Sequence, residues 1–145
     1  MPPLTQMELD GFLAQAPIVT LCTLNADGTI HAAPIWFKYD GGEILLGTQQ
    51  DARRIKNLKK NPNVTLLVDV DQPPYKGVIV YGKAQLDFDN VIAKRISIFE
   101  KYMPKANAEK LANGLASMRK PVIIRVKPTK MVSYDYAKDQ SGMFK

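Results

Sequence analysis

The sequence predicts a mainly β fold with some α-helix (α+β), built as a small barrel of six or seven mostly antiparallel strands with a few flanking helices. Short segments rich in β-branched residues alternate with turn signals at regular spacing over the first half of the chain. The turns are too short for the crossovers that parallel strands require. A closed barrel would leave no exposed sheet edge, which favours that arrangement over an open sheet.

Length and composition indicate one ordinary soluble domain spanning residues 1–145. The hydrophobic fraction is 46% and the charged fraction 23%, both typical of globular proteins. A single cysteine excludes an intramolecular disulfide and favours a reducing, cytoplasmic setting. No apolar run approaches the ~20 residues of a membrane-spanning helix. The N-terminus lacks the basic and apolar regions of a secretory signal, so we expect no membrane partner.

The first third of the chain reads as a helix followed by three strands. Residues 6–15 form a short amphipathic helix, with Thr5 as its cap and Glu8 completing a capping box. Strands are expected over 18–24, 30–39 and 43–48. Residues 25–28 and 40–42 supply the tight, glycine-containing turns that join them.

The middle of the chain predicts one helix and two strands. Asp51 is the expected cap of a helix that runs to about Lys60 and ends at Asn61-Pro62. A strand over 64–70 and a loop over 71–76 follow. Residues 77–88 alternate cleanly, and one face carries Val78, Val80, Gly82, Ala84, Leu86 and Phe88.

The last third predicts two helices and the closing strands. Asn90 is expected to cap a helix that ends near Met103, before Pro104, and a second helix spans about 107–118. Residues 121–128 form the last core strand, and 130–136 could pair as one more. We expect a mobile tail from about residue 138.

Several kinds of site are excluded by the residues present. One histidine and one cysteine cannot build a His/Cys zinc site, so no metal is expected. His31 is interpreted as an ordinary strand histidine and Cys22 as a small buried hydrophobe. The chain contains no Gly-x-Gly-x-x-Gly sequence and no P-loop. No residue can be assigned a catalytic acid or base.

One segment is suited to binding phosphate. A strand ends at Thr48, and a helix then begins with Arg53 and Arg54 in its first turn. Unpaired amides at a helix N-terminus favour anions, and arginine adds charge-assisted hydrogen bonds. A solvated basic helix face is the alternative interpretation. Trp36 lies on the neighbouring strand, where a flat ligand could rest with its phosphate reaching the arginines; the alternative for Trp36 is a core or dimer-interface position.

These motifs occur in an order that resembles the pyridoxamine 5′-phosphate oxidase-like family. The order is a hairpin, Pro-x-Trp-Phe, an apolar strand ending in Thr, a basic pair, and Asn-Leu-x-x-Asn-Pro-x-Val. The resemblance extends from about Leu4 to Tyr136. It implies a split β-barrel that binds flavin at a homodimer interface, in a branch that includes FMN proteins and others using the deazaflavin F420.

The resemblance also implies binding residues. Arg53 and Arg54 match the basic pair on the FMN phosphate, and Thr48 matches the threonine beside it. Pro34, Ile35 and Trp36 match the strand along the flavin ring, and Lys56 is a further phosphate or ribityl contact. The partner subunit would complete such a site, with Tyr81, Gly82 and Tyr134 as candidates.

Two departures bear on the activity. Ala52 stands where a serine or threonine often precedes the basic pair, and the Arg-x-His signature of true pyridoxamine phosphate oxidases is absent. The resemblance therefore implies an FMN-dependent oxidoreductase acting on another small molecule. The alternatives are an F420-dependent reductase and a non-catalytic flavin- or haem-binding protein. A nucleic-acid binder using the basic helix is disfavoured, because no aromatic residues interleave with the basic run.

Overall fold

The computed structural model describes residues 2–143. Its elements, in chain order, are α1 (Gln6–Gln15), β1 (Val19–Leu24), β2 (Ile30–Ile35), β3 (Phe37–Asp40), β4 (Glu43–Gln49), α2 (Arg53–Lys60), β5 (Asn63–Asp69), β6 (Lys76–Asp87), α3 (Val91–Phe99), α4 (Lys105–Met118), β7 (Pro121–Asp135) and a 3-10 turn, η1 (Tyr136–Lys138). All strand pairings are antiparallel. The predicted α+β class is confirmed.

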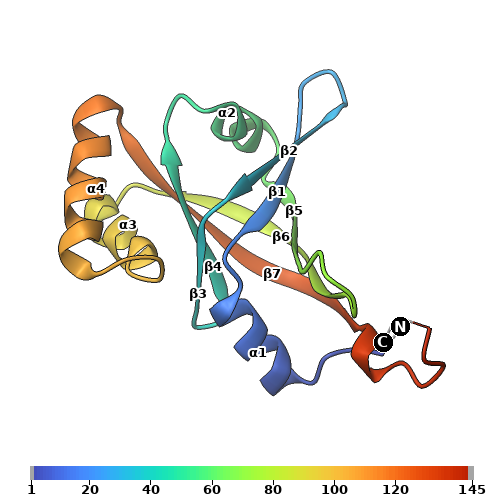
Figure 1. The fold of residues 1–145 in the computed structure, drawn as a ribbon. Helices are drawn as coiled ribbons and strands as arrows, with labels where there is room; N and C mark the ends of the chain where they lie inside the picture. Colours follow the sequence, from blue (N-terminus) through green and yellow to red (C-terminus); the bar gives the residue numbers. More distant parts are fainter. Residues whose placement is uncertain (1, 144–145) are drawn as a thin grey trace.

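The seven strands form one strongly curled sheet in the order β2-β1-β5-β6-β7-β4-β3 (Figure 1). Its two edge strands, β2 and β3, are consecutive in the chain and are separated by Trp36 alone. The predicted strand over 30–39 is therefore two strands at opposite edges of the sheet. The fold is a split barrel, as the family resemblance implies, and the chain itself crosses the opening at Trp36.

Two apolar clusters lie on opposite faces of the sheet. The inner cluster fills the curl with alternate residues of the strands and is covered by α1; it includes Leu13, Leu21, Phe37, Ile44, Leu46, Leu66, Val80 and Ile124. The outer cluster joins Leu45 and Ile123 to α3 and α4, which lie together on one side of the sheet (Figure 1). Strands β4 and β7 thus carry apolar residues on both faces, which places them at the centre of the packing.

The longest pairing joins β6 and β7, and it corrects the sequence-based expectation at one point. Residues 121–128 and 130–136, expected as separate strands, form one strand paired with β6 over twelve registered positions, with an irregularity between Tyr81 and Gly82. A Cβ atom at Gly82 would lie 2.5 Å from the carbonyl oxygen of Lys127. The backbone of β7 therefore approaches β6 closely at Gly82.

The helix caps agree with the sequence at one of three places. Thr5 and Glu8 form the predicted capping box of α1. Asp51 does not cap α2, because Ala52 holds the N-cap position without a side-chain bond and Asp51 pairs with Arg119 at 2.7 Å. Asn90 occupies the N-cap of α3 in a left-handed conformation (φ 47°) and makes no capping bond.

The ends of the described chain meet beside α1. The amide of Asp135 donates to the carbonyl of Pro2 at 2.8 Å, and Lys138 Nζ donates to the carbonyl of Pro3 and pairs with Glu8. Hydrogen bonding to Lys138 is the main reason that the pKa of Glu8 falls to about 2. The expected mobile tail begins at this anchored lysine and stays a prediction; its last two residues lie outside the described chain. Within residues 2–143, no helix has the length and apolarity needed to cross a membrane.

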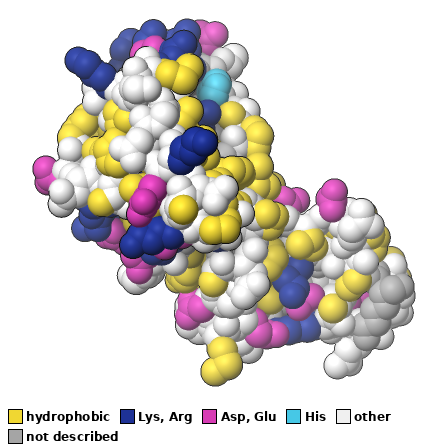
Figure 2. All heavy atoms as spheres, turned by 60° about the vertical axis from the view of Figure 1, so that its left-hand side comes forward, with side chains coloured by type: hydrophobic (Ala, Val, Ile, Leu, Met, Phe, Trp, Pro, Cys, Tyr) yellow, Lys and Arg dark blue, Asp and Glu magenta, His cyan; other side chains and the backbone are white. Residues whose placement is uncertain are grey.

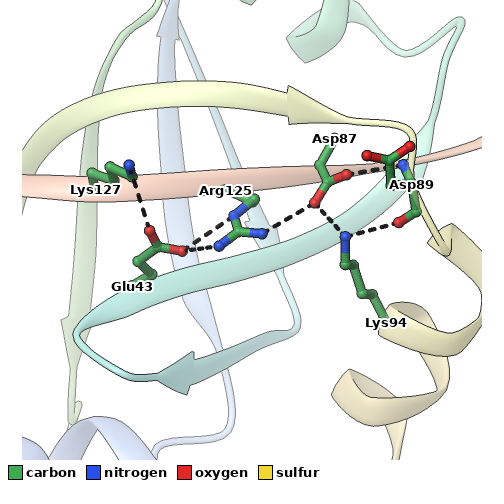
Figure 3. A network of polar contacts seen from close by, with 6 residues as sticks. All are labelled: Glu43, Asp87, Asp89, Lys94, Arg125 and Lys127. Carbon is green, nitrogen blue, oxygen red and sulfur yellow. Dashed lines mark hydrogen bonds and ion pairs between the residues drawn. The ribbon is translucent and has the colours of Figure 1, made fainter.

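A network of ion pairs fastens α3 to the sheet (Figure 3). Arg125 on β7 donates to Glu43 at 2.6 Å and to Asp87 at 3.3 Å, and Lys94 of α3 reaches the same Asp87 oxygen at 2.6 Å. The hydrogen bond from Lys94 is the main cause that lowers the pKa of Asp87. Strands β4, β6 and β7 and helix α3 are thereby joined through two carboxylates.

The close approach at Gly82 gives a stability prediction. Gly82→Ala should lower the free energy of unfolding by ~1–3 kcal/mol, because the new methyl group displaces the β7 backbone. Gly114 is the matched control: it lies in α4, and a methyl group added there would meet no atom within 4 Å. Gly114→Ala should raise stability by ~0.5–1 kcal/mol through helix propensity. Urea unfolding measures both, and equal effects would contradict the proposed strain at Gly82.

Candidate functional site

Helix α2 begins directly after β4 with unpaired donors. Its N-cap, Ala52, accepts from the amides of Ile55 and Lys56. The amides of Arg53 and Arg54 make no hydrogen bond to any residue in 2–143. Two free amides at the positive end of a helix, with two arginine side chains beside them, form the kind of arrangement that binds an anion.

Arg54 is the more enclosed arginine of this pair. Its side chain is half-buried, its Nη1 atom is buried without a hydrogen-bond partner, and burial lowers its pKa. A buried donor without an acceptor costs about 1–3 kcal/mol. A phosphate oxygen at this position would remove that cost, so the residues fit a phosphorylated ligand.

Arg53 faces the turn between β1 and β2. It lines a groove of about 330 Å³ with Ala26, Asn57 and the lysines of α2, namely Lys56, Lys59 and Lys60. Figure 2 shows Lys and Arg side chains gathered at the top of the molecule, the end at which α2 and this turn lie in Figure 1. Buried Asn57 donates to Thr23 at 3.0 Å and to Asn25 at 2.9 Å, which holds α2 against the hairpin.

A second hollow shares Ala26 and Arg53 with this groove. Asn25, Ala26, Asp27 and His31 line it together with Arg53. The Nδ1 atom of His31 is buried there without a partner among the described residues. Sequence reasoning assigned His31 no role, because a strand histidine carries no local signal of what it will face.

Trp36 is held by the segment that joins α3 to α4. Its ring stacks on Tyr102 at 4.3 Å between centroids and 13° between planes, and Phe99 meets it edge-on at 5.7 Å. The indole remains 38% exposed. The hydroxyl of Tyr102 accepts from the amide of Phe37 at 3.0 Å and lies 3.2 Å from its carbonyl oxygen. This hydroxyl fixes the backbone at the crossing between the sheet edges.

The side-chain amine of Lys101 lies at the same crossing, where it contacts Phe37 and has a lowered pKa. Its Nζ lies 3.6 Å from the centroid of the Phe37 ring and donates to the Phe37 carbonyl at 3.1 Å. Burial lowers its pKa from 10.5 to about 8. Neither Lys101 nor Tyr102 could be found from the sequence, because they reach Trp36 and Phe37 from a segment some 65 residues away.

The other predicted site residues fall at distinct places. Pro34 is exposed on β2 opposite Thr20, and Ile35 packs against the inner core. Thr48 is 4% exposed on β4. Arg53 and Lys56 share a groove whose lining does not include Arg54. The structure thus joins Arg53 to Lys56, and it places Trp36 against Phe99 at the end of α3 and against Tyr102 in the segment that follows.

The outer face of the sheet carries an apolar hollow of about 540 Å³. Its lining includes Cys22, Leu24, Ile30, Tyr81 and Gly82. Ile30 is 68% exposed, and burial raises the pKa of the Cys22 thiol. Tyr134, the other candidate for a partner's site, packs its ring against Gly77. In the described part of the chain, no group of three or more His, Cys, Asp or Glu residues could hold a metal ion.

Comparisons with known proteins agree with this architecture. Residues 5–133 match the family described as pyridoxamine 5′-phosphate oxidase. The search of curated proteins found no match. A conserved hypothetical protein of Mycobacterium tuberculosis is similar with a TM-score of 0.80 and 23% identity, over 92% of this chain and 86% of that one.

Two further solved structures share the fold. An F420 reductase has a TM-score of 0.67 and 24% identity, over 84% of this chain and 94% of that one. The haem storage protein HutZ from Vibrio cholerae has a TM-score of 0.70 and 17% identity, over 90% and 95% respectively. At these identities, the likeness shows the fold alone.

The hydrogen bonds between the Tyr102 hydroxyl and the backbone of Phe37 can be tested by mutation. Tyr102→Phe should lower the free energy of unfolding by ~1–3 kcal/mol, because the amide of Phe37 loses its partner. Tyr75→Phe is the control, since the Tyr75 side chain is 40% exposed, and it should change stability by less than ~0.5 kcal/mol. Chemical denaturation compares the two variants. Equal losses in the free energy of unfolding would argue against a stabilising role of the Tyr102 hydroxyl.

The lowered pKa of Lys101 predicts how the stability of the protein depends on pH. The folded state binds the proton of Lys101 less tightly than the unfolded state, so between its pKa of about 8 and the ordinary value of 10.5 the unfolded chain carries more protons. This lysine's contribution to stability should therefore rise as pH increases through that window. Lys101→Met should remove that rise in denaturant unfolding. NMR titration of the Lys101 Cε resonance should give a midpoint near 8; a midpoint near 10.5 would contradict the assignment.

Proposed function

This chain belongs to the pyridoxamine 5′-phosphate oxidase family, and on that basis we propose that it binds FMN and acts as an oxidoreductase on a small molecule. The observation that carries the proposal is Arg54, an arginine in the first turn of α2 whose Nη1 is buried without a partner among residues 2–143, on a helix whose first two amides are also free. A phosphate group accepts hydrogen bonds from free helix amides and from arginine alike, and a bidentate contact suits the guanidinium.

The proposed binding residues divide into two sets. Arg53 and Arg54 hold the phosphate, with Thr48 at the end of the adjoining strand and Lys56 as a further contact along the groove. The flavin ring lies along the backbone of Pro34, Ile35 and Trp36. This strand is suited to that role because it is an edge of the sheet, with one side unpaired by other strands.

The bound flavin would supply the hydride- or electron-transfer chemistry. The chain's own contribution is binding, orientation and electrostatics. Lys101, with its depressed pKa, is a cation beside the crossing strand, and Tyr102 fixes the backbone there. No side chain is assigned as the catalytic acid or base.

A second copy of the chain is proposed to complete the site. The apolar hollow lined by Leu24, Ile30 and Tyr81 leaves large hydrophobic side chains open on the outer face of the sheet. Exposed apolar patches of this kind mark association surfaces. We expect a homodimer in solution, which sedimentation or light scattering tests directly, and no binding to nucleic acid or membrane.

One observation favours F420 as the alternative cofactor. Lys56, Lys59 and Lys60 continue the basic lining of the Arg53 groove along α2, beyond the first turn. A longer anionic tail than that of FMN would use these lysines. The similar F420 reductase makes deazaflavin the first comparison to run.

The absorption spectrum of the purified protein after incubation with FMN, F420 or haem, followed by desalting, tests the proposal. A retained two-band flavin spectrum supports FMN, and a single deazaflavin band supports F420. A haem Soret band without either flavin would favour a non-catalytic haem-binding role. Bound flavin that common reductants and acceptors do not turn over would indicate storage or sensing. No retained cofactor would contradict the proposal.

Arg54 provides the mutational test. Arg54→Met keeps the aliphatic packing and removes the charged donors, so the cofactor's dissociation constant should rise roughly ten- to a hundredfold. Lys110→Met is the control, because Lys110 is an exposed cation on α4, and it should leave affinity unchanged. Fluorescence titration measures both. Unchanged affinity in Arg54→Met would refute the phosphate assignment.

A further inference from the structure

The arginine that is buried most deeply has no partner. Arg119 and Arg125, whose side chains are 60% and 35% exposed, both pair with carboxylates. Arg95 is 8% exposed and makes no hydrogen bond or ion pair with any residue between 2 and 143. Physical chemistry predicts the reverse order, since a buried charge needs a partner more than an exposed one does.

The surroundings of Arg95 do not supply a substitute for that partner. The guanidinium lies 5.5 Å from the centroid of the Phe99 ring, a cation–π contact that leaves the N–H groups without acceptors. Its neighbour on α3, Lys94, takes the nearby carboxylate of Asp87 at 2.6 Å (Figure 3). The fold therefore has an acid beside α3, and that acid is used by Lys94 and Arg125 rather than by Arg95.

The Arg95 side chain packs against Gly47 of β4, where the absence of a side chain leaves space for it. A Cβ atom at Gly47 would lie 3.2 Å from Cγ and 3.3 Å from Nε of Arg95. A side chain at this position would crowd Arg95 and require it to shift by a few tenths of an ångström. The glycine thus lets the side chain of the unpaired arginine pack closely against β4.

The position is beside the exposed tryptophan. Phe37, the residue after Trp36, pairs with Leu46, the residue before Gly47. Phe99 contacts both partners: Arg95 lies over its ring, and Trp36 meets it edge-on. Nε is the one Arg95 nitrogen found both buried and unpartnered, so the terminal nitrogens reach the surface. An anion arriving beside Trp36 could therefore contact them.

We propose that Arg95 binds the carboxylate of an aromatic substrate whose ring rests beside Trp36. The planar guanidinium matches a carboxylate with two parallel hydrogen bonds, and the exposed ring of Trp36, stacked on Tyr102, forms the adjoining aromatic surface. The proposal deepens the proposed function, because this carboxylate belongs to the molecule on which the bound flavin would act. This site is separate from the proposed phosphate site, because Arg95 belongs to α3 whereas Arg53 and Arg54 belong to α2.

The chain offers a direct optical reporter, because Trp36 is its single tryptophan. Benzoate is titrated into the cofactor-free protein at constant ionic strength while Trp36 fluorescence is followed. Benzamide, which has the same ring without the charge, is the ligand control. Arg95→Met should weaken benzoate binding roughly tenfold or more, and Arg95→Lys should weaken it less, because lysine keeps the charge without the fork. Arg119→Met should bind as the wild type does.

A second readout does not depend on how the variants fold. In the wild-type protein, the buried Nε–H of Arg95 should give a resolved NMR signal that shifts when benzoate is added and stays when benzamide is added. Equal binding of the two ligands, an unmoved Nε–H signal, or unchanged benzoate affinity in a folded Arg95→Met would each overturn the assignment.

Cofactor retention on the same proteins separates this inference from the proposed function. Arg95-dependent benzoate binding in a protein that retains no flavin would support the carboxylate site and refute the flavin proposal. Flavin retention without Arg95-dependent benzoate binding would refute the carboxylate site alone. Arg95→Met that keeps flavin and loses benzoate would support both.

Discussion

The crossing of the chain between the two edges of the sheet is the constraint on which the remaining structure depends. One residue, Trp36, separates β2 from β3, so the curl of the whole sheet must bring its edges within a single peptide step. The hydroxyl of Tyr102 holds the next residue by its amide and carbonyl. Helices α3 and α4 are therefore part of the barrel's closure, and the ion pairs that fasten α3 to β6 and β7 serve the same purpose.

The basic side chains of this protein fall into two groups: some are paired with carboxylates and join elements of the fold, and others are unpaired within residues 2–143 and suited to binding a ligand. Arg125 and Lys94 are satisfied by carboxylates and join elements of the fold. Arg54 and Arg95 are more enclosed, yet neither has an acidic partner in the described chain. A fold that leaves its buried cations unpaired retains a cost in stability that a bound anion would remove. The two arginines lie on different helices, α2 and α3, so two separate anionic groups are expected.

Local sequence signals predicted the elements whose causes are local. The capping box of α1, the glycine turns and the alternation along β6 are examples, because each depends on residues within a few positions. The division of the predicted strand over 30–39 had no such signal, since Ile35 and Phe37 both favour a strand and the change of partner is decided by distant β1 and β4. Lys101, Tyr102 and Arg95 were missed for the same reason: their roles arise from contacts across the fold.

The single-residue crossing also restricts how the chain length can vary. Ile35 packs into the interior and Phe37 is fully buried, while Trp36 between them faces outward. Because side chains alternate along extended backbone, one inserted residue here would turn either Ile35 or Phe37 to the opposite face. The turn at 40–42, where Gly41 and Gly42 adopt positive φ, faces no such parity rule. Insertions and deletions in relatives of this fold should therefore accumulate in its turns. The crossing at Trp36 should keep the same number of residues.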